Sequence, residues 1–466
     1  MLLLLSTLAL ATPPPGPTAQ QVAQYGALPM VLPGSAPRRG PPPPASSGPA
    51  VTVYGYHAYW SADPTALDFE RLTHLALFNV DLNSDGSLGS TEHWTDIAGA
   101  VVPVAHSHGV RVHLCVTAFD ENAHTQVFGS PTLRATAIAN MKALVDEYGA
   151  DGVMIDIEAM DVSNRDGYST FVEELAAAVD DVFLSTPAVN WSGAFDYGRL
   201  AAATQGLFIM AYNYHWSGGD PGPNDPLYGA SPWDYHAIEW SVDDYVASGA
   251  PRNKLILGLP LYGWEWPTDS AAVPGTATGT GNSVLFAEAA ALAAAETSLY
   301  DTPSHSPYLL RANSQIWYAD TSSVQERIAW AVGNRMQGVG FWALGYEGDD
   351  PAFWDMVRIE TAADRVPGPK DTGGDTDSDT GGDTDEDTDV DTDVDTDVPE
   401  DTDPSDDTGT SVDTDDTDVG DTAADPAVND DEAGGCGCVT GSGGPAASGG
   451  LLVALGLLLG LRRRTH

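Results

Sequence analysis

The chain has 466 residues and carries 67 acidic against 19 basic residues, a formal net charge of −48. This acidity argues against a nucleic acid as a partner, because phosphate backbones attract basic surfaces. Of three cysteines, Cys115 is the only one between residues 50 and 362, so a disulfide inside that region is excluded. Cys115 lies in an apolar run, and we interpret it as a core residue rather than a catalytic thiol.

The N-terminal region divides into two parts. Residues 1–11 hold an apolar run that ends in small residues, which predicts a secretory signal although no Lys or Arg precedes the run. Residues 12–49 are rich in Pro and Gly, with four consecutive prolines at 41–44. Because this composition opposes regular hydrogen-bonded structure, we expect an extended spacer here.

Residues 50–362 alternate strand and helix patterns. Apolar residues at helical spacing follow residues 130–131 and stop at Gly149, and a second helical stripe begins at Tyr168. The sequence Ser323-Val-Gln-Glu326 predicts a capped helix start. Strands that alternate with helices imply a parallel sheet, and eight strands imply the α/β class and a (β/α)8 TIM barrel. The predicted strands are 51–57, 74–80, 110–117, 152–157, 182–189, 207–214, 255–261 and 339–343.

The connection between the seventh and eighth predicted strands is too long for a simple crossover, since about 75 residues separate them. It contains a Gly/Thr-rich stretch at 275–281 and an Ala-rich helical pattern at 288–296. We therefore expect a small inserted lobe between strands 7 and 8.

Residues 363–435 form an acidic region rich in Asp and Thr. Between residues 371 and 432 there are 27 acidic residues and no basic one. Such a run repels itself and has almost nothing to bury, which predicts a disordered linker. Calcium binding is the alternative, but the regular Gly and the bidentate Glu of a calcium loop are missing.

The last residues, 436–466, carry three successive signals. Cys436-Gly-Cys438 precedes an apolar segment at 446–461, and three arginines follow at 462–464. The apolar segment is short for a membrane span, yet the arginines after it fit the positive-inside rule. The three parts resemble the MYXO-CTERM sorting tail of myxobacterial envelope proteins. That resemblance implies export and retention at the cell surface, and a plain C-terminal membrane anchor is the alternative.

Two acids stand at the end of the fourth predicted strand, in Asp151-Gly-Val-Met-Ile-Asp156-Ile-Glu158. Side chains alternate along a strand, so Met154, Asp156 and Glu158 share one face, with the Cα atoms of successive members roughly 6.5 Å apart. Like charges this close raise one another's pKa, and ionising both would destabilise the fold, so the pair is not explained by a role in stability. Paired carboxyl groups with separated pKa values are what acid-catalysed cleavage of a glycoside requires.

Aromatic residues stand near the ends of the other predicted strands. Flat rings stack on the C–H faces of sugars, and polar groups between them read the hydroxyl pattern. Any one of these rings could simply be core, but their gathering at one end of a barrel favours a saccharide groove. They are Tyr56, Trp60, Tyr212, Tyr214, Tyr262, Trp264, Trp266 and Trp342.

Four motifs together resemble glycoside hydrolase family 18, the family of chitinases and endo-β-N-acetylglucosaminidases. They occur in the family's order over about 290 residues. The short insertion looks most like the bacterial branch that acts on cell-wall or spore-cortex glycans. The motifs are the fourth-strand sequence, Met210-Ala-Tyr212-Asn213, Gly258-Leu-Pro-Leu-Tyr262-Gly263 and Gly338-Val-Gly-Phe-Trp342.

The resemblance implies a catalytic role for three residues. Glu158 would be the general acid, and Asp156 would orient the substrate's N-acetyl group, whose carbonyl oxygen attacks the anomeric carbon. Tyr212 would hydrogen-bond the acetamido oxygen, and configuration would be retained. The remaining expected binding residues are Tyr56, Trp60, Met210, Asn213, Tyr262, Trp264 and Trp342, with Trp342 as the floor under the sugar.

Two positions depart from the usual family pattern. Met154 stands where most members have a third aspartate, and Asn213 stands where many have aspartate. The loss of the inner aspartate would shift the pH optimum or lower the rate, but it does not remove the acid. A surface lectin that binds N-acetylglucosamine polymers without cleaving them is the main alternative, and a passive envelope scaffold is a weaker one.

No cofactor is expected. His106, His108 and His113 lack the spacing and the acidic partners of a zinc site, so we expect no metal. The expected partners are an N-acetylglucosamine-containing polysaccharide and, through the C-terminal tail, a membrane. We expect an exported monomer anchored in the cell envelope.

Overall fold

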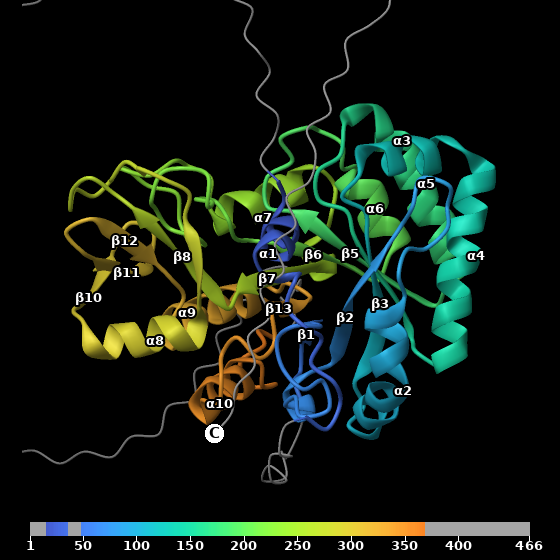
Figure 1. Ribbon diagram of the computed structural model, residues 1–466, viewed down its shortest axis with the longest axis horizontal. Helices are drawn as coiled ribbons and strands as arrows, with labels where there is room; N and C mark the ends of the chain where they lie inside the picture. The colour runs from blue at the N-terminus through green and yellow to red at the C-terminus, as the bar shows by residue number, and fades with distance from the viewer. Residues whose placement is uncertain (1–14, 36–47, 369–466) are drawn as a thin grey trace, which may run out of the picture. The chain divides into compact units, whose positions relative to one another are not determined.

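Eight parallel strands close into a barrel in the computed structural model, which describes residues 15–35 and 48–368. Around the barrel the strands follow the order β1-β13-β7-β6-β5-β4-β3-β2 (Figure 1). The predicted (β/α)8 barrel is therefore confirmed. Its strands are β1 (Thr52–Ala58), β2 (His74–Asp81), β3 (Arg111–Thr117), β4 (Gly152–Asp156), β5 (Asp181–Pro187), β6 (Gly206–Met210), β7 (Leu255–Pro260) and β13 (Gly338–Trp342).

The sixth strand ends earlier than predicted, at Met210 instead of Tyr214. The backbone N–H of Tyr212 donates to the Met210 carbonyl at 2.8 Å, which turns the chain out of the sheet. Asn213 then adopts a φ of 60°, a left-handed conformation that cannot continue a strand. The prediction failed here because the apolar and aromatic residues beyond Met210 line the barrel mouth and have the composition of a strand.

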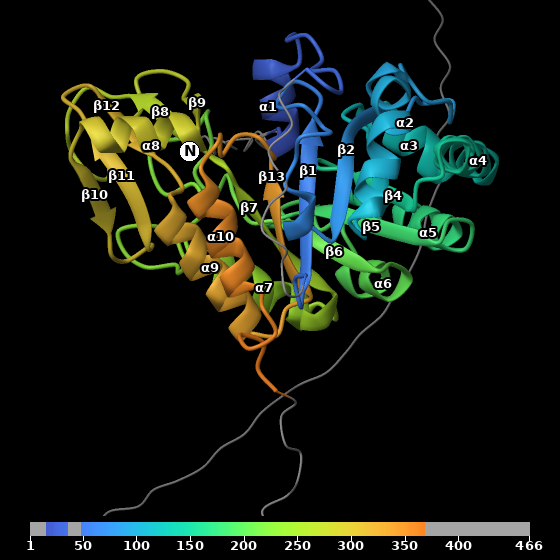
Figure 2. The same cartoon turned by 90° about the horizontal axis from the view of Figure 1, so that it is seen from below.

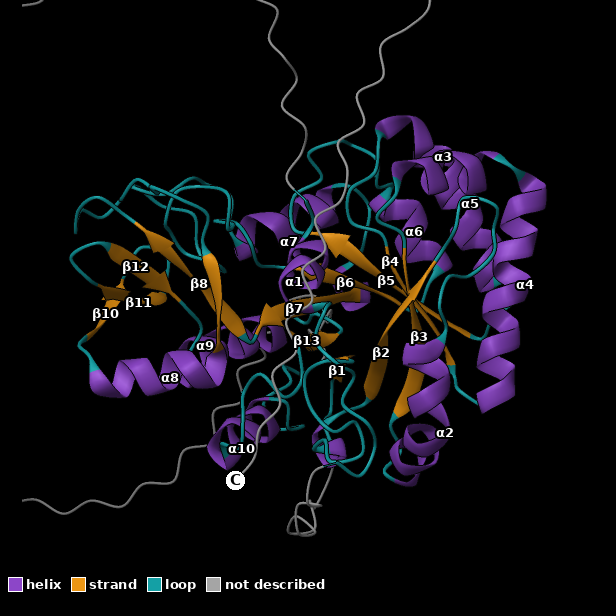
Figure 3. Ribbon diagram, in the orientation of Figure 1, coloured by secondary structure: helices purple, strands orange, loops and turns teal. Residues whose placement is uncertain are grey.

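Helices surround the barrel strands (Figure 3). Two predicted helices are present, the first ending where Gly149 takes a φ of 64° and the second beginning at Arg165. The helices outside the insertion and the N-terminal segment are α2 (Glu92–Ser107), α3 (Glu121–Gly129), α4 (Pro131–Tyr148), α5 (Arg165–Ala176), α6 (Tyr197–Ala203), α7 (Ile238–Ala247), α9 (Thr321–Gly333) and α10 (Pro351–Glu360), with short 3₁₀ turns at η1 (Phe69–Arg71), η2 (Val162–Asn164) and η3 (Arg252–Lys254).

Helix α9 begins one turn before the predicted start, so the capping prediction was wrong in its position. Asp320 is the N-cap, and its carboxylate accepts the Ser323 backbone N–H at 2.8 Å. The Ser323 hydroxyl accepts the backbone N–H of Asp320 at 2.9 Å in return. Ser323 therefore belongs to the capping box as its third helical residue and not as its first member.

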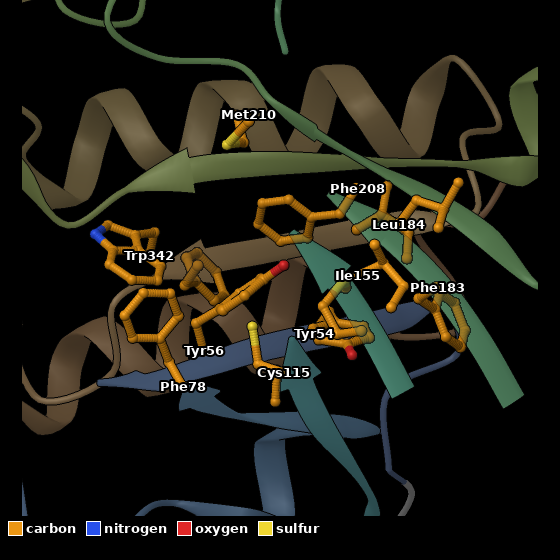
Figure 4. Close-up of a cluster of buried hydrophobic side chains, with 14 of the residues drawn as sticks. Tyr54, Tyr56, Phe78, Cys115, Ile155, Phe183, Leu184, Phe208, Met210 and Trp342 are labelled. Atoms are coloured by element: carbon orange, nitrogen blue, oxygen red, sulfur yellow. The ribbon is translucent and has the colours of Figure 1, made fainter. Parts of the chain in front are cut away.

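Large aromatic side chains fill the barrel interior (Figure 4). The Phe208 ring packs edge-on against Tyr54 and Tyr56, with centroids 6.0 and 5.1 Å apart. Gly258 on β7 and Gly340 on β13 are register partners, and a Cβ on either would overlap the Phe208 ring. The two glycines therefore make room for one large side chain at the centre of the barrel.

The predicted lobe between the seventh and eighth barrel strands is present. It consists of a five-stranded antiparallel sheet in the order β10-β11-β12-β8-β9 and one helix, with a small hydrophobic cluster of its own. Its elements are β8 (Tyr262–Pro267), β9 (Asn282–Leu285), α8 (Phe286–Ala295), β10 (Ser298–Asp301), β11 (Ser306–Leu310) and β12 (Ser314–Trp317).

The expected extended spacer over residues 12–49 is wrong for part of its described residues, and residues 12–14 and 36–47 lie outside the described chain. Residues Pro17–Tyr25 form helix α1, with Pro17 at its first position, where a missing N–H costs nothing. Figure 2 shows α1 at one end of the barrel, between the inserted lobe and the side formed by β1 and β2. The composition misled because tertiary contacts, described below for Thr18, hold this short helix in place.

Three expectations lie outside the described residues: the signal at 1–11, nearly all of the acidic linker at 363–435, and the tail at 436–466. Among residues 15–35 and 48–368, none of the helices is long and apolar enough to cross a membrane.

Candidate active site

The carboxyl groups of Asp156 and Glu158 meet at the carboxyl end of β4. Both side chains are buried, with Asp156 fully inaccessible and Glu158 6% exposed. The hydroxyl of Thr18, on α1, lies 3.1 Å from Asp156 Oδ2 and also makes a short hydrogen bond to Glu158 Oε1. Because one hydroxyl reaches both carboxyl groups, the two acids converge on a single point.

The surroundings of the pair favour protonation. Burial is the largest cause that raises the pKa of Glu158, and the neighbouring charge of Asp156 raises it further. Hydrogen bonds from Thr18 and Ala19 oppose this rise only in part. Burial also raises the pKa of Asp156, against hydrogen bonds from Ser185 and Thr18. Glu158 can therefore hold a proton at pH values at which an exposed glutamate is ionised.

Tyr212 lies just beyond the end of β6, and its ring is buried beside the carboxyl pair. Burial raises the pKa of its hydroxyl, and the charges of Tyr262, Asp156 and Glu158 add to the effect. The rings of Tyr212 and Tyr262 pack edge to face with centroids 6.0 Å apart. Tyr212 therefore keeps its proton and can act as a hydrogen-bond donor near the two acids.

Asn213 links the barrel to the inserted lobe. Its side-chain oxygen accepts hydrogen bonds from the Tyr262 hydroxyl at 2.7 Å and from the Trp264 indole N–H at 3.0 Å. Its backbone N–H donates to Asn224 Oδ1 at 3.0 Å. Within the described residues, the Asn213 side-chain nitrogen is buried and has no hydrogen-bond partner. That N–H2 group is therefore a free donor beside Tyr262 and Trp264.

Trp342, at the end of β13, packs near Tyr56 and Trp60, the expected binding residues in and after the first strand. Its ring centroid lies 5.4 Å from that of Tyr56 and 6.5 Å from that of Trp60. Figure 4 shows Trp342 beside Tyr56 and Phe78 inside the barrel. Met210 is buried at the end of β6. The three expected catalytic and seven expected binding residues thus come from the ends of β1, β4, β6 and β13 or from the start of the lobe strand β8.

Met154 is fully buried on β4 and has Cys115 and Phe183 as its register partners. An apolar side chain in this position suits the aromatic interior better than a third carboxyl group would. Burial raises the pKa of the Cys115 thiol well above its usual range. A thiol that stays protonated is a poor nucleophile, which agrees with Cys115 as a core residue.

The histidines that we considered as metal ligands have other partners. His106 Nε2 lies 2.8 Å from Asp151 Oδ2, and His113 Nδ1 lies 2.6 Å from the Tyr54 hydroxyl. No group of three or more His, Cys, Asp or Glu residues within residues 15–35 and 48–368 has the arrangement of a metal site.

Two residues of the site, one at the carboxyl pair and one beside Trp60, were not found from the sequence. Thr18 lies 138 positions before Asp156 in a stretch rich in Pro and Gly, so no local pattern marks it. Tyr346, whose hydroxyl accepts the Trp60 indole N–H at 2.8 Å, follows the last barrel strand. Its place after a strand end, which it shares with the residues that were found, is the signal that could have identified it.

Comparisons with known proteins identify a matching family and several relatives. The sequence model described as "Glycosyl hydrolases family 18" matches residues 52–347. A Bacillus subtilis protein assigned as the sporulation-specific glycosylase YdhD is 28% identical over 250 residues, covering 51% of this chain and 56% of that protein. The cortical fragment-lytic enzyme of Bacillus subtilis is 20% identical over 298 residues, covering 59% and 65%. The chain thus spans less than two thirds of the length of either relative.

Among solved structures, the family 18 chitinase from Cycas revoluta in complex with (GlcNAc)3 superimposes with a TM-score of 0.61 at 19% identity. The match covers 67% of this chain and 100% of the chitinase. At this identity the likeness supports the fold alone.

Proposed function

The chain belongs to family 18 of the glycosyl hydrolases, and from that membership we propose that it hydrolyses β-1,4 bonds next to N-acetylglucosamine. The observation that carries the proposal is the convergence of two buried carboxyl groups, both with raised pKa values, at the mouth of a barrel lined with aromatic rings. The candidate substrates are chitin, peptidoglycan and related glycans, since all present the acetamido group that the reaction needs.

Glu158 acts as the general acid in the proposed reaction. Its carboxyl hydrogen passes to the glycosidic oxygen as the bond from that oxygen to the anomeric carbon breaks. The raised pKa of Glu158 supports this role, because the group must be protonated before the reaction starts. Glu158, now an ionised carboxylate, then takes a proton from the water molecule that completes the hydrolysis and so returns to its protonated form.

The nucleophile is the substrate's own acetamido oxygen, which attacks the anomeric carbon to form an oxazolinium ion. Asp156 lies beside Glu158 and stabilises the positive charge that develops on the acetamido nitrogen. Tyr212 donates a hydrogen bond to the reacting oxygen. Water attacks the anomeric carbon on the face opposite to the departing acetamido oxygen, so two inversions give net retention.

Binding of the sugar rings is assigned to the surrounding aromatic residues. Trp342 forms the floor under the reacting sugar, and Trp60 offers a second ring beside it. The unpartnered side-chain nitrogen of Asn213 supplies a donor for a sugar hydroxyl or acetamido carbonyl. An amide at this position binds without adding a third negative charge to the pair.

The relatives named for sporulation and for cortical fragment lysis favour a cell-wall glycan among the candidate substrates. We further propose export and retention at the cell envelope through the C-terminal tail, on the strength of the sequence signals at 1–11 and 436–466. A lectin without turnover is the less favoured reading, because Glu158 is present and buried beside Asp156.

The test is a product analysis of purified full chain on chitin oligomers, peptidoglycan and a high-mannose glycopeptide in parallel. We expect a new reducing end at N-acetylglucosamine on at least one substrate, first formed as the β-anomer. Glu158→Gln should abolish the product, whereas Glu239→Gln, on the exposed face of α7, should not. Product that persists in Glu158→Gln would overturn the assignment of the acid.

A further inference from the structure

Helix α1 occupies the space directly above the carboxyl pair. Three hydrogen bonds reach Glu158 from it: the backbone N–H of Thr18 at 2.7 Å, the backbone N–H of Ala19 at 3.0 Å, and the Thr18 hydroxyl. Thr18 is 1% exposed, so its side chain is enclosed by the cleft. We propose that residues 15–35 are an autoinhibitory segment that keeps the glycosidase latent until the segment leaves the cleft, an inference that rests on the proposed function.

The contacts compete directly with catalysis. The Glu158 oxygens that must approach the glycosidic oxygen are the acceptors of the α1 hydrogen bonds. The Asp156 oxygen that would face the acetamido group is the acceptor of the Thr18 hydroxyl. A sugar at the reacting position and Thr18 therefore need the same space and the same hydrogen-bonding atoms, so only one of them can be present.

The segment suits an acidic site. Residues 15–35 contain no charged side chain, in a chain with a net charge of −48. Helix α1 directs its N-terminus at the carboxyl pair, where its free N–H groups and the positive end of its dipole stabilise an anion. The approach is also close, since a Cβ on Gly16 would overlap the Cβ of Glu158. The segment is thus matched to this pair in charge and in shape.

A second contact covers an expected sugar-binding ring. Tyr25, in the last turn of α1, stacks on Trp60 with centroids 6.4 Å apart and planes 27° apart. Gln21, fully buried on the same face of the helix, accepts a hydrogen bond from the Tyr346 hydroxyl at 3.3 Å. A flat ring on Trp60 and a polar group beside it are the contacts that a bound sugar would make.

The segment is also held on both sides of the cleft. On the side of the lobe, the Ser217 hydroxyl donates to Gln20 at 2.9 Å, and the Ser283 backbone N–H donates to Gln24 at 3.3 Å. On the side of β1, the Tyr59 hydroxyl donates to the Gly26 carbonyl at 2.7 Å.

The chain then continues over the loop after β1. The Val31 backbone N–H donates to the Tyr59 carbonyl at 2.8 Å, and the Gly34 backbone N–H donates to the Thr65 hydroxyl at 3.3 Å. Residues 15–35 therefore reach from the side of the lobe, over the carboxyl pair, to the loop after β1, and an oligosaccharide that extends along this path must displace them.

Two substitutions in the full chain should release the segment. Gly16→Val forces a side chain into Glu158, and Gly48→Val is its matched control because a Cβ there has no neighbour within 4 Å. Thr18→Glu adds a third carboxyl group to the pair, and Ala23→Glu adds the same group on the exposed face of α1 as its control. Loss of one hydrogen bond to a protonated carboxyl group changes the closed-to-open ratio roughly twofold to tenfold, and each substitution disturbs more than one of the three hydrogen bonds to Glu158.

The readouts are kcat/KM on chitotetraose, the Kd for chitotetraose, and hydrogen exchange of the backbone N–H groups of residues 17–25. If the proposal holds, Gly16→Val and Thr18→Glu raise kcat/KM at least about tenfold, tighten Kd and speed exchange in α1. Gly48→Val and Ala23→Glu should match wild type in all three measurements.

The outcomes separate this proposal from the proposed function. Cleavage that needs Glu158 but has equal kcat/KM in wild type, Gly16→Val and Thr18→Glu would overturn autoinhibition and leave the glycosidase intact. If no chain cleaves the oligomer, the proposed function fails on this substrate. The Kd for chitotetraose then tests whether residues 15–35 block the binding of the oligomer. Tighter binding by the released variants would then support it, whereas equal binding, or none by any chain, would overturn it.

Discussion

Replacing Glu158 with Gln tests the proposed acid through two effects of opposite sign. The amide has nearly the same shape but cannot donate a proton to the leaving oxygen. A positioned general acid contributes about 10²–10⁴-fold, so kcat on chitotetraose should fall by a factor in this range. Asp156 and Tyr212 remain in place, and binding of the oligomer should therefore be largely retained.

The same substitution should stabilise the fold as the pH rises. Burial and the charge of Asp156 raise the pKa of Glu158 above its ordinary value of 4.5 in the folded chain. A carboxyl group of this kind contributes stability that is fully present below the unfolded pKa and is lost as the pH rises through the folded pKa. Between these two values, the unfolding free energy of Glu158→Gln minus that of wild type should grow by about 1.4 kcal/mol per pH unit.

The assay is urea unfolding, followed by circular dichroism, at several pH values between about 5 and 7. The slope against pH is the informative quantity, because a constant difference in hydrogen bonding to α1 cancels from it. Glu239→Gln, which replaces an exposed carboxyl group, should give no such slope. A flat or falling difference for Glu158→Gln would refute the reasoning, since Glu158 would then not be destabilised by burial of its charge.

Three further predictions concern neighbouring parts of the molecule. Gly258→Ala should lower the unfolding free energy by about 1–3 kcal/mol, because its Cβ would overlap the Phe208 ring, and Phe208→Leu should recover part of the loss. Tyr212→Phe should lower kcat about 10²-fold with little change in KM, because its hydrogen bond strengthens only in the transition state. Arg327→Met should cost about 3–5 kcal/mol in urea unfolding, because it leaves the buried carboxylate of Asp225 without its cation at 2.7 Å.

Each of these has a contradicting result. Gly333→Ala is the control for Gly258→Ala, because a Cβ at Gly333 meets nothing within 4 Å, and it should change the unfolding free energy by at most about 1 kcal/mol. If Gly258→Ala lowers the unfolding free energy no more than Gly333→Ala does, the overlap with Phe208 is not costly. A Tyr212→Phe variant that raises KM and keeps kcat would make the hydroxyl a binding group only. An Arg327→Met chain as stable as wild type would mean that Asp225 takes up a proton at little cost.

The barrel could be predicted from the sequence because its signals are local. Each strand is a short apolar run, and Gly149 ends its helix by a conformation that other residues rarely adopt. The convergence of Asp156 and Glu158 followed from alternation along one strand and needed no long-range information. The closed topology then placed the residues at the ends of the other strands around the same point.

The covering helix could not be predicted, because its stability comes from contacts across the chain. A nine-residue helix without charged residues is marginal by itself, and Thr18 gains its partners 138 to 140 positions away. The end of the sixth strand failed for a related reason, since Asn213 is held by Tyr262 and Trp264 of the lobe. In both places tertiary hydrogen bonds override the local composition.

The stacking of Tyr25 on Trp60 places one indole under two selective demands. If the same ring must hold both a glycan and the chain's own helix, a substitution that improves one fit will usually weaken the other. Changes of substrate preference during evolution would then require paired substitutions at positions 25 and 60. Comparison of related sequences should reveal covariation between the N-terminal helix and the first barrel strand's loop, which are encoded far apart.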